Sequence, residues 1–189
     1  MASYDLALQQ VLQHEGGYAN DPVDRGGETF RGVARNIHPQ WPGWKRIDSL
    51  RHRSDFPRSL ARDSGLQKAV ASFYRENYWN PIQGDLIADE AVAQELMDTA
   101  VNMGVRRAAR FLQESLNLLN RDQKNYEDLV VDGWLGEKSL GALGKLLRAD
   151  RNSHHLLKML NAMQAATYID IMRNNPSQER FARGWLARA

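Results

Sequence analysis

Apolar residues recur along most of the chain at the three- and four-residue spacing of an amphipathic helix. Glycines and prolines interrupt this pattern where helices are expected to end, as at Gly16-Gly17, Gly104 and Pro176. The spacing predicts helices over residues 3–15, 64–80, 92–103, 105–119 and 152–173, followed by a short terminal helix. The chain is therefore expected to be mainly α-helical.

Between residues 16 and 62 the helical pattern is lost. The segment GGYANDPVDRGGETFRGVA holds five glycines and a proline, a composition typical of turns joined by short strands. We expect two or three short strands between residues 16 and 62, and no helix within this segment. The predicted architecture is a helical bundle with a small β-rich lobe inserted after the first helix.

Composition excludes several classes of protein. The chain has 189 residues, which corresponds to one domain or to two small ones tightly joined. It has no cysteine, so disulfides, thiolate zinc sites and cysteine nucleophiles are excluded. Its five histidines show no chelating spacing and no phosphate-binding glycine loop is present, so we expect no metal and no cofactor.

Charge and hydropathy bear on the partners of the chain. There are 25 basic and 23 acidic residues, and the arginines are scattered among acids rather than gathered on one element, so we expect no nucleic-acid binding. No apolar stretch is long enough to span a bilayer, and the first residues lack a basic region followed by an apolar run. We expect a monomer made in the cytoplasm without a signal peptide or a stable membrane anchor.

Glu15 is the strongest catalytic candidate among the residues themselves. It lies on the apolar face at the last turn of the first predicted helix. Burial and the negative end of the helix dipole both disfavour ionisation, so we expect its pKa to be raised. A protonated carboxyl group beside a glycine-rich turn is what general acid catalysis of glycoside cleavage requires. The alternative is that Glu15 caps the helix or pairs with Arg31 or Arg35.

Two aspartates and a threonine follow in the glycine-rich segment. Asp21 and Asp24 lie six and nine residues after Glu15, and glycoside hydrolysis needs a second, ionised carboxyl group. A helix end followed by a hairpin can place such a group across a cleft, where Thr29 could position a water or brace the second acid. Each aspartate has a competing role in a turn, since Asp21 precedes Pro22 and Asp24 precedes a Gly-Gly pair. Both alternatives stay open.

The segment HEGGYANDPVDRGGETFRGVA resembles the signature of glycoside hydrolase family 108, the lysozyme-like N-acetylmuramidases of phage endolysins and secretion-associated bacterial muramidases. The family pattern E-G-G-Y, N-D-P, D-x-G-G-x-T and G-V is matched without a gap. The resemblance implies a lysozyme-like fold in which Glu15 is the catalytic acid and Asp24 with Thr29 forms the second pair. Later, VVDGWLGEKSLGAL resembles the D-G-x-x-G turn of peptidoglycan-binding modules. It implies a catalytic part over residues 1–95 and a peptidoglycan-binding part over 96–189, packed as one globular unit.

Aromatic side chains are concentrated in the half of the chain that contains the signature. Flat sugar faces stack well on aromatic rings that have a polar edge. Tyr74 has the spacing of a core residue, whereas Trp41 and Trp44 lie in a proline-rich loop and either line a cleft or anchor that loop. The substrate-binding candidates are Tyr18, Asp21, Trp41, Trp44, Tyr78 and Asn102.

These features predict a peptidoglycan hydrolase that cleaves the β-1,4 bond between N-acetylmuramic acid and N-acetylglucosamine without a cofactor. The alternatives are a non-catalytic peptidoglycan-binding protein and a hydrolase of a related polysaccharide such as chitin. Because the substrate lies outside the inner membrane, we expect delivery to the periplasm to need a holin or a dedicated export partner.

Overall fold

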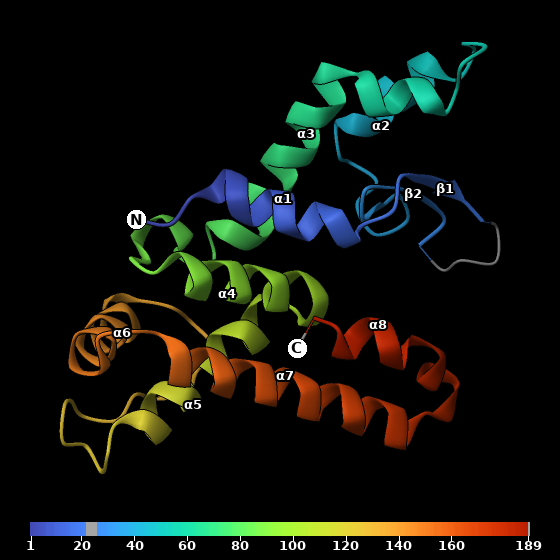
Figure 1. Cartoon of the computed structure of the whole chain (residues 1–189). Helices are drawn as coiled ribbons and strands as arrows, with labels where there is room; N and C mark the ends of the chain where they lie inside the picture. Colours follow the sequence, from blue (N-terminus) through green and yellow to red (C-terminus); the bar gives the residue numbers. More distant parts are fainter. Residues whose placement is uncertain (22–25, 189) are drawn as a thin grey trace. The chain divides into compact units, whose positions relative to one another are not determined.

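The computed structural model describes residues 1–21 and 26–188, except for the side chain of His14. The chain divides into two compact units, which we call the N-terminal unit (Tyr4–Asn80) and the C-terminal unit (Pro81–Ala189 with Met1–Ser3) (Figure 1). The domain boundary predicted after residue 95 falls inside a helix of the C-terminal unit.

The N-terminal unit begins with a helix and continues into a small sheet before its remaining helices. Strand order in the sheet is β1-β2-β3, with antiparallel pairing that sets Ala19 opposite Thr29 and Phe30 opposite Val33. Its elements are α1 (Tyr4–His14), β1 (Tyr18–Asn20), β2 (Glu28–Phe30), β3 (Val33–Ala34), α2 (Gly43–Leu50), η1 (Arg58–Arg62), α3 (Ser64–Tyr74) and the π-helix η2 (Arg75–Trp79).

Helix α2 corrects the expectation that no helix lies between residues 16 and 62. Trp44 and Ile47 lie one turn apart and are both buried. Pro42 occupies the N-cap with φ −63°, a helical angle that the proline ring fixes in advance. The prolines around Trp41 suggested an irregular loop, but one of them starts the helix.

Helix α3 follows the predicted pattern. Asp63 caps its start, because the carboxylate accepts a hydrogen bond of 2.9 Å from the backbone N–H of Leu66. Its apolar face buries Leu66, Val70 and Phe73. Phe73 meets the ring of Trp41 edge to face, so α3 and the segment before α2 share one aromatic core.

The regular elements of the C-terminal unit that the structure describes are all helices. Helices α4, α5 and α7 pack against one another (Figure 1) and bury Leu96, Leu112 and Leu160. The elements are η3 (Gly84–Leu86), α4 (Glu90–Met103), α5 (Val105–Leu119), α6 (Glu137–Asp150), α7 (His154–Asn174), η4 (Pro176–Phe181) and α8 (Ala182–Leu186).

The predicted class, a mainly α-helical protein with a small sheet after the first helix, is confirmed. Helix α6 is an addition to the prediction, since Gly141 and Gly144 weakened its helical signal. Among the residues described, no helix combines the length and apolar character needed to cross a membrane.

Candidate active site

Glu15 lies directly after α1, where its carboxylate meets the turn between β2 and β3. A β-carbon added to Gly32 would lie 2.8 Å from Glu15 Oε2 and closer still to the hydroxyl oxygen of Tyr74. Gly32 also has φ +78°, a conformation that other residues rarely adopt. Only glycine therefore lets the hairpin backbone approach the Glu15 carboxylate this closely.

Two tyrosines lie near Glu15. The Tyr74 hydroxyl donates a hydrogen bond of 3.0 Å to the carbonyl of Arg31, the residue before Gly32. The rings of Tyr74 and Tyr78 lie 5.5 Å apart. Burial raises the pKa of the Tyr78 phenol, and the charge of Glu15 raises it further. The phenol of Tyr78 therefore remains a neutral hydrogen-bond donor in the electrostatic field of Glu15.

The π-helix η2 carries Tyr78 directly after α3. Its wider turn changes the direction in which side chains leave the helix, and such turns are frequent at functional sites. Here it follows Tyr74 without a break, so two aromatic side chains four residues apart both belong to the Glu15 surroundings. Trp79, at the end of the same turn, is fully buried and anchors it.

The register of the sheet separates two of the predicted site residues. Thr29 is half-buried, and its hydroxyl donates to the Gly27 carbonyl at 3.2 Å. Tyr18 pairs with Phe30, and because side chains alternate along a strand, Tyr18 and Thr29 lie on opposite faces of the sheet. Tyr18 packs edge to face on Phe56 and accepts a hydrogen bond from Arg51 at 3.4 Å.

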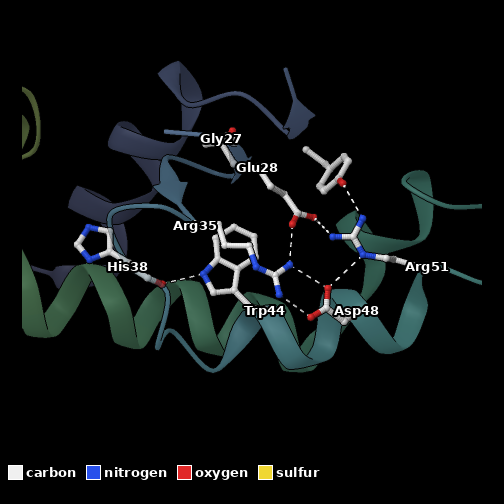
Figure 2. Close-up of polar contacts among 9 residues, drawn as sticks. Gly27, Glu28, Arg35, His38, Trp44, Asp48 and Arg51 are labelled. Carbon is white, nitrogen blue, oxygen red and sulfur yellow. Dashed lines mark hydrogen bonds and ion pairs between the residues drawn. The ribbon is translucent and has the colours of Figure 1, made fainter. Parts of the chain in front are cut away.

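An ionic cluster holds the sheet to α2 (Figure 2). The buried Glu28 carboxylate accepts from Arg35 and Arg51, each at 2.6 Å. Asp48 on α2 binds the same two guanidinium groups at 2.6 and 3.1 Å. Hydrogen bonds from Arg35 lower the pKa of Asp48 to about 2. Glu28, Arg35, Asp48 and Arg51, which we call the ionic cluster, therefore fix the strand that carries Thr29.

The ionic cluster also bears on the structural alternative for Glu15. Arg35 was one of the two arginines expected to pair with Glu15 if that residue were structural. Its guanidinium binds Glu28 and Asp48 and stacks 5.2 Å from the centre of the Trp44 ring. Arg35 is thus a member of the ionic cluster.

Trp41 and Trp44 are both buried in the N-terminal unit. Trp44 is 2% exposed, and its indole N–H donates to the His38 carbonyl at 2.8 Å. This favours the alternative in which Trp44 anchors the loop. Trp41 donates to the Ala69 carbonyl at 3.2 Å and also lines a groove of about 410 Å³ together with Pro39, Gln40, Phe73, Glu76 and Asn77.

The remaining predicted residues are placed as follows. Asp21 is exposed directly after β1, and Asp24 lies outside the described residues. Asn102 belongs to α4 in the C-terminal unit, where its amide donates to the Asp98 carbonyl at 2.8 Å and to Asp98 Oδ2 at 3.0 Å. Arg188 donates in turn to the Asn102 side-chain oxygen.

Sequence reasoning did not find Gly32, Tyr74 or the ionic cluster. Tyr74 had the spacing of a core residue and is indeed buried, but the contact of its hydroxyl with the hairpin depends on the tertiary fold. The described residues hold no group of three or more His, Asp or Glu side chains arranged to bind a metal ion. The chemistry that this site offers is that of a carboxyl group among tyrosines.

Comparison with known proteins gives two family matches that follow one another along the chain. The family described as Glycosyl hydrolase 108 matches residues 8–104, and the one described as Predicted Peptidoglycan domain matches residues 107–189. No significant relative is found among curated proteins. Among solved structures, the chain is similar to SagA of Brucella abortus, with 25% sequence identity and a TM-score of 0.56 over 98% of this chain and 88% of that one.

The first match spans more than half of the chain and contains Glu15, the β-hairpin and both tyrosines. The second covers α5 to α8, the region in which the sequence predicts peptidoglycan binding. The chain belongs to the glycosyl hydrolase 108 family and is a lysozyme-type peptidoglycan hydrolase.

Proposed function

We propose that the enzyme is an N-acetylmuramidase that hydrolyses the β-1,4 bond between N-acetylmuramic acid and N-acetylglucosamine, with Glu15 as the general acid. The observation that carries this proposal is the setting of the Glu15 carboxylate, which lies beside Gly32 at the point that the Tyr74 hydroxyl also approaches. A carboxyl group held at a helix end beside a hairpin supports this role, because general acid catalysis needs a positioned carboxyl group within reach of the glycosidic oxygen.

In this mechanism Glu15 gives its proton to the leaving oxygen as the bond from C1 to that oxygen breaks. Asp24 is the second carboxylate, which either attacks C1 or takes a proton from the water that attacks it. Thr29 holds that water or braces Asp24. A separation of about 5 Å between the two carboxyl groups leads to retention of the anomer, and about 6.5–9.5 Å leads to inversion.

The same proposal assigns sugar contacts around the carboxyl group. Tyr78 lies within the electrostatic field of Glu15, so it is the first candidate to contact the sugar on which Glu15 acts. Trp41 lines a groove in the same unit and is a second candidate. Tyr18, Asp21 and Asn102 are further candidates for substrate contact, whereas the buried Trp44 anchors the loop beside Trp41.

Replacement of Glu15 by Gln tests the proposal. The amide cannot donate the catalytic proton, so release of reducing ends from purified peptidoglycan should fall at least 10²–10⁴-fold, the range typical of general acid catalysis. Asp55→Asn is the control, because Asp55 is an exposed carboxylate of the same unit that does not line the Trp41 groove, and this variant should keep wild-type turnover. Melting curves of both variants establish that they fold.

The result also separates the alternatives. Glu15→Gln protein that retains more than a tenth of the activity would remove Glu15 from the mechanism. Wild-type protein that sediments with peptidoglycan but releases no reducing ends would be a binding protein instead of an enzyme. Faster hydrolysis of chitin than of peptidoglycan would make a related polysaccharide the substrate.

A second pair of variants separates the two aspartates. Asp24→Asn should strongly impair turnover, whereas Asp21→Asn should act through the stability of the loop, since Asp21 precedes a proline in a turn. Activity per folded molecule and melting temperature are measured together. Full activity of Asp24→Asn with a lowered melting temperature would mean that the two aspartates exchange these roles or share them.

We further propose that the enzyme reaches the periplasm after its synthesis, through a holin or a dedicated export partner. Helix α1 buries Ala7 and Val11 in the N-terminal unit and leads directly to Glu15, so a signal cleaved from it would remove part of the fold. Expression in a bacterial host should leave the cells intact until the inner membrane is permeabilised, and turbidity then falls. Spontaneous lysis with protein in the periplasm would contradict this.

A further inference from the structure

The C-terminal unit contains a groove that the mechanism does not use. It lies between the irregular segment from Tyr126 to Gly136 and the first half of α6, and its volume is about 990 Å³. Trp134 and Val130 line it and are 62% and 79% exposed. Two large apolar side chains on a groove wall form a surface suited to a ligand.

The amide side chains of Gln113, which is buried, and Asn117, which is half-buried, hold this irregular segment in place. Gln113 donates to Asp132 Oδ1 at 2.8 Å and to the Trp134 carbonyl at 2.9 Å, and it accepts from the Gly133 N–H at 2.9 Å. Asn117 bonds both backbone groups of Leu129 at 2.8 Å. The exposed residues are therefore fixed before a ligand arrives, which lowers the entropic cost of binding.

Trp134 itself is oriented by a neighbouring cation. The guanidinium carbon of Arg106 on α5 lies 4.9 Å from the centre of the Trp134 ring, a stacking distance. The backbone N–H of Trp134 donates a hydrogen bond of 2.9 Å to Asp132 Oδ1. The ring keeps one position while most of its surface stays accessible, as a platform for the flat C–H face of a sugar requires.

The charge of the lining selects among the components of a cell wall. Carboxylates outnumber lysines around the groove, and the hydrogen bonds from Gln113 and Trp134 lower the pKa of Asp132 and so keep it ionised. The charged residues in the lining are Glu127, Asp128, Asp132, Glu137, Lys138 and Lys145. Excess negative charge disfavours the anionic stem peptides, whereas an N-acetylated sugar chain is neutral.

We propose that this groove binds the N-acetylated glycan strand of peptidoglycan, with Trp134 as the stacking platform, at a site separate from the Glu15 carboxyl group. The choice of polymer rests on the proposed function and on the match of residues 107–189 to a predicted peptidoglycan domain. The choice of glycan over peptide rests on the charge and the apolar wall of the groove.

The test follows the indole N–H signal of Trp134 by NMR in the full-length Glu15→Gln protein, which does not degrade the probe. The signal is assigned with Trp134→Phe. Chitotetraose should shift it in a saturable manner, and the free stem tetrapeptide should leave it unmoved. A shift with the tetrapeptide alone, or with neither probe, would overturn the proposal.

Sedimentation with purified sacculi gives a second readout. Trp134→Ala should weaken the association about tenfold, as for a residue that dominates a binding site. Leu118→Ala is the control, because Leu118 is 61% exposed on the same unit but does not line the groove. Wild-type binding by Trp134→Ala would also overturn the proposal.

Hydrolysis of short soluble oligosaccharides distinguishes a failure of this inference from a failure of the proposed function. Trp134→Ala should cleave them at the wild-type rate, since the groove acts only on binding to the polymer. If the wild-type protein cleaves no substrate, the hydrolase proposal fails, while the Trp134 signal still decides whether the groove binds glycan.

Discussion

The two units fix their irregular segments by different chemistry. In the N-terminal unit the ionic cluster ties β2 to α2 through paired carboxylates and guanidinium groups. In the C-terminal unit the neutral amides of Gln113, Asn117 and Asn120 hold the segment that bears Trp134. The first arrangement surrounds the chemistry of Glu15, and the second supports the groove proposed for binding.

This difference determines how each unit responds to its surroundings. Asp48 has a pKa lowered to about 2, so its contribution to stability is present above its ordinary value near 3.8 and is lost as pH falls through about 2. Partly exposed ion pairs are also screened by salt. The amides do not titrate, so the Trp134 segment should keep its geometry as long as Asp132, whose pKa their hydrogen bonds lower, stays ionised.

The largest expected effect compares two glycines with nearly equal backbone angles. Gly32 has φ +78° and Gly133 has φ +82°, and a β-carbon would crowd a neighbour at each. Gly32→Ala should reduce turnover about a hundredfold, because displacement of a catalytic group by about 1 Å has an effect of that size. Gly133→Ala should weaken binding to sacculi and leave turnover of soluble oligosaccharides unchanged.

Rates per folded molecule and sedimentation are measured for both variants. Equal loss of turnover in the two would show that strain alone, at about 1–2 kcal/mol for a positive φ, explains the effect. Full activity of Gly32→Ala would mean that the hairpin does not position Glu15.

The helices that carry this site could be predicted from the sequence, but the contacts between side chains from different elements could not. The periodicity of Leu66, Val70 and Phe73 was sufficient to predict α3, because helical spacing is local. The proximity of Gly32, Glu15 and Tyr74 was not visible, since it joins three elements distant in sequence. The signature was sufficient to place Glu15 at a helix end. It did not show that Arg35 binds Glu28 and Asp48, because these contacts also join residues that are separated in sequence.

The next comparison is between two carboxylates, one in each unit. Burial and the charge of Asp98 raise the pKa of Glu95 on α4 to about 7. The folded state therefore binds a proton that the unfolded state releases above about 4.5, and stability falls as pH rises from about 4.5 to 7. The difference in free energy of unfolding between Glu95→Gln and wild type should therefore move in favour of the variant by about 3 kcal/mol as pH rises through this range.

Urea unfolding at pH 4 and pH 8 measures this gain, with the exposed Glu114→Gln on α5 as the control. Glu28→Gln should have the opposite sign and cost about 2 kcal/mol at pH 8, because it leaves Arg35 and Arg51 with one charged partner fewer. If Glu95→Gln and Glu28→Gln shift stability in the same direction at pH 8, the contrast between the units is wrong.

The smallest expected effect concerns the amides themselves. Gln113→Met keeps the volume of the side chain but removes its hydrogen bonds to the Trp134 segment, at a cost of about 2 kcal/mol. Gln94→Met removes a single bond to Glu90 one turn away and should cost about 0.5 kcal/mol or less. The melting temperature of each variant is measured at low and high salt. The decrease caused by Gln113→Met should be the same at both. A salt-dependent loss would indicate that charge, not amide bonding, holds the segment.

The identity of the new reducing end tests the central claim most directly. Peptidoglycan digested by the full-length enzyme is reduced with borohydride, and the fragments are identified by mass spectrometry. Hydrolysis after N-acetylmuramic acid predicts fragments that end in N-acetylmuramitol, with none from the Glu15→Gln protein. Fragments that end in N-acetylglucosaminitol, or in a sugar that borohydride cannot reduce, would contradict the assignment of both the bond and the mechanism.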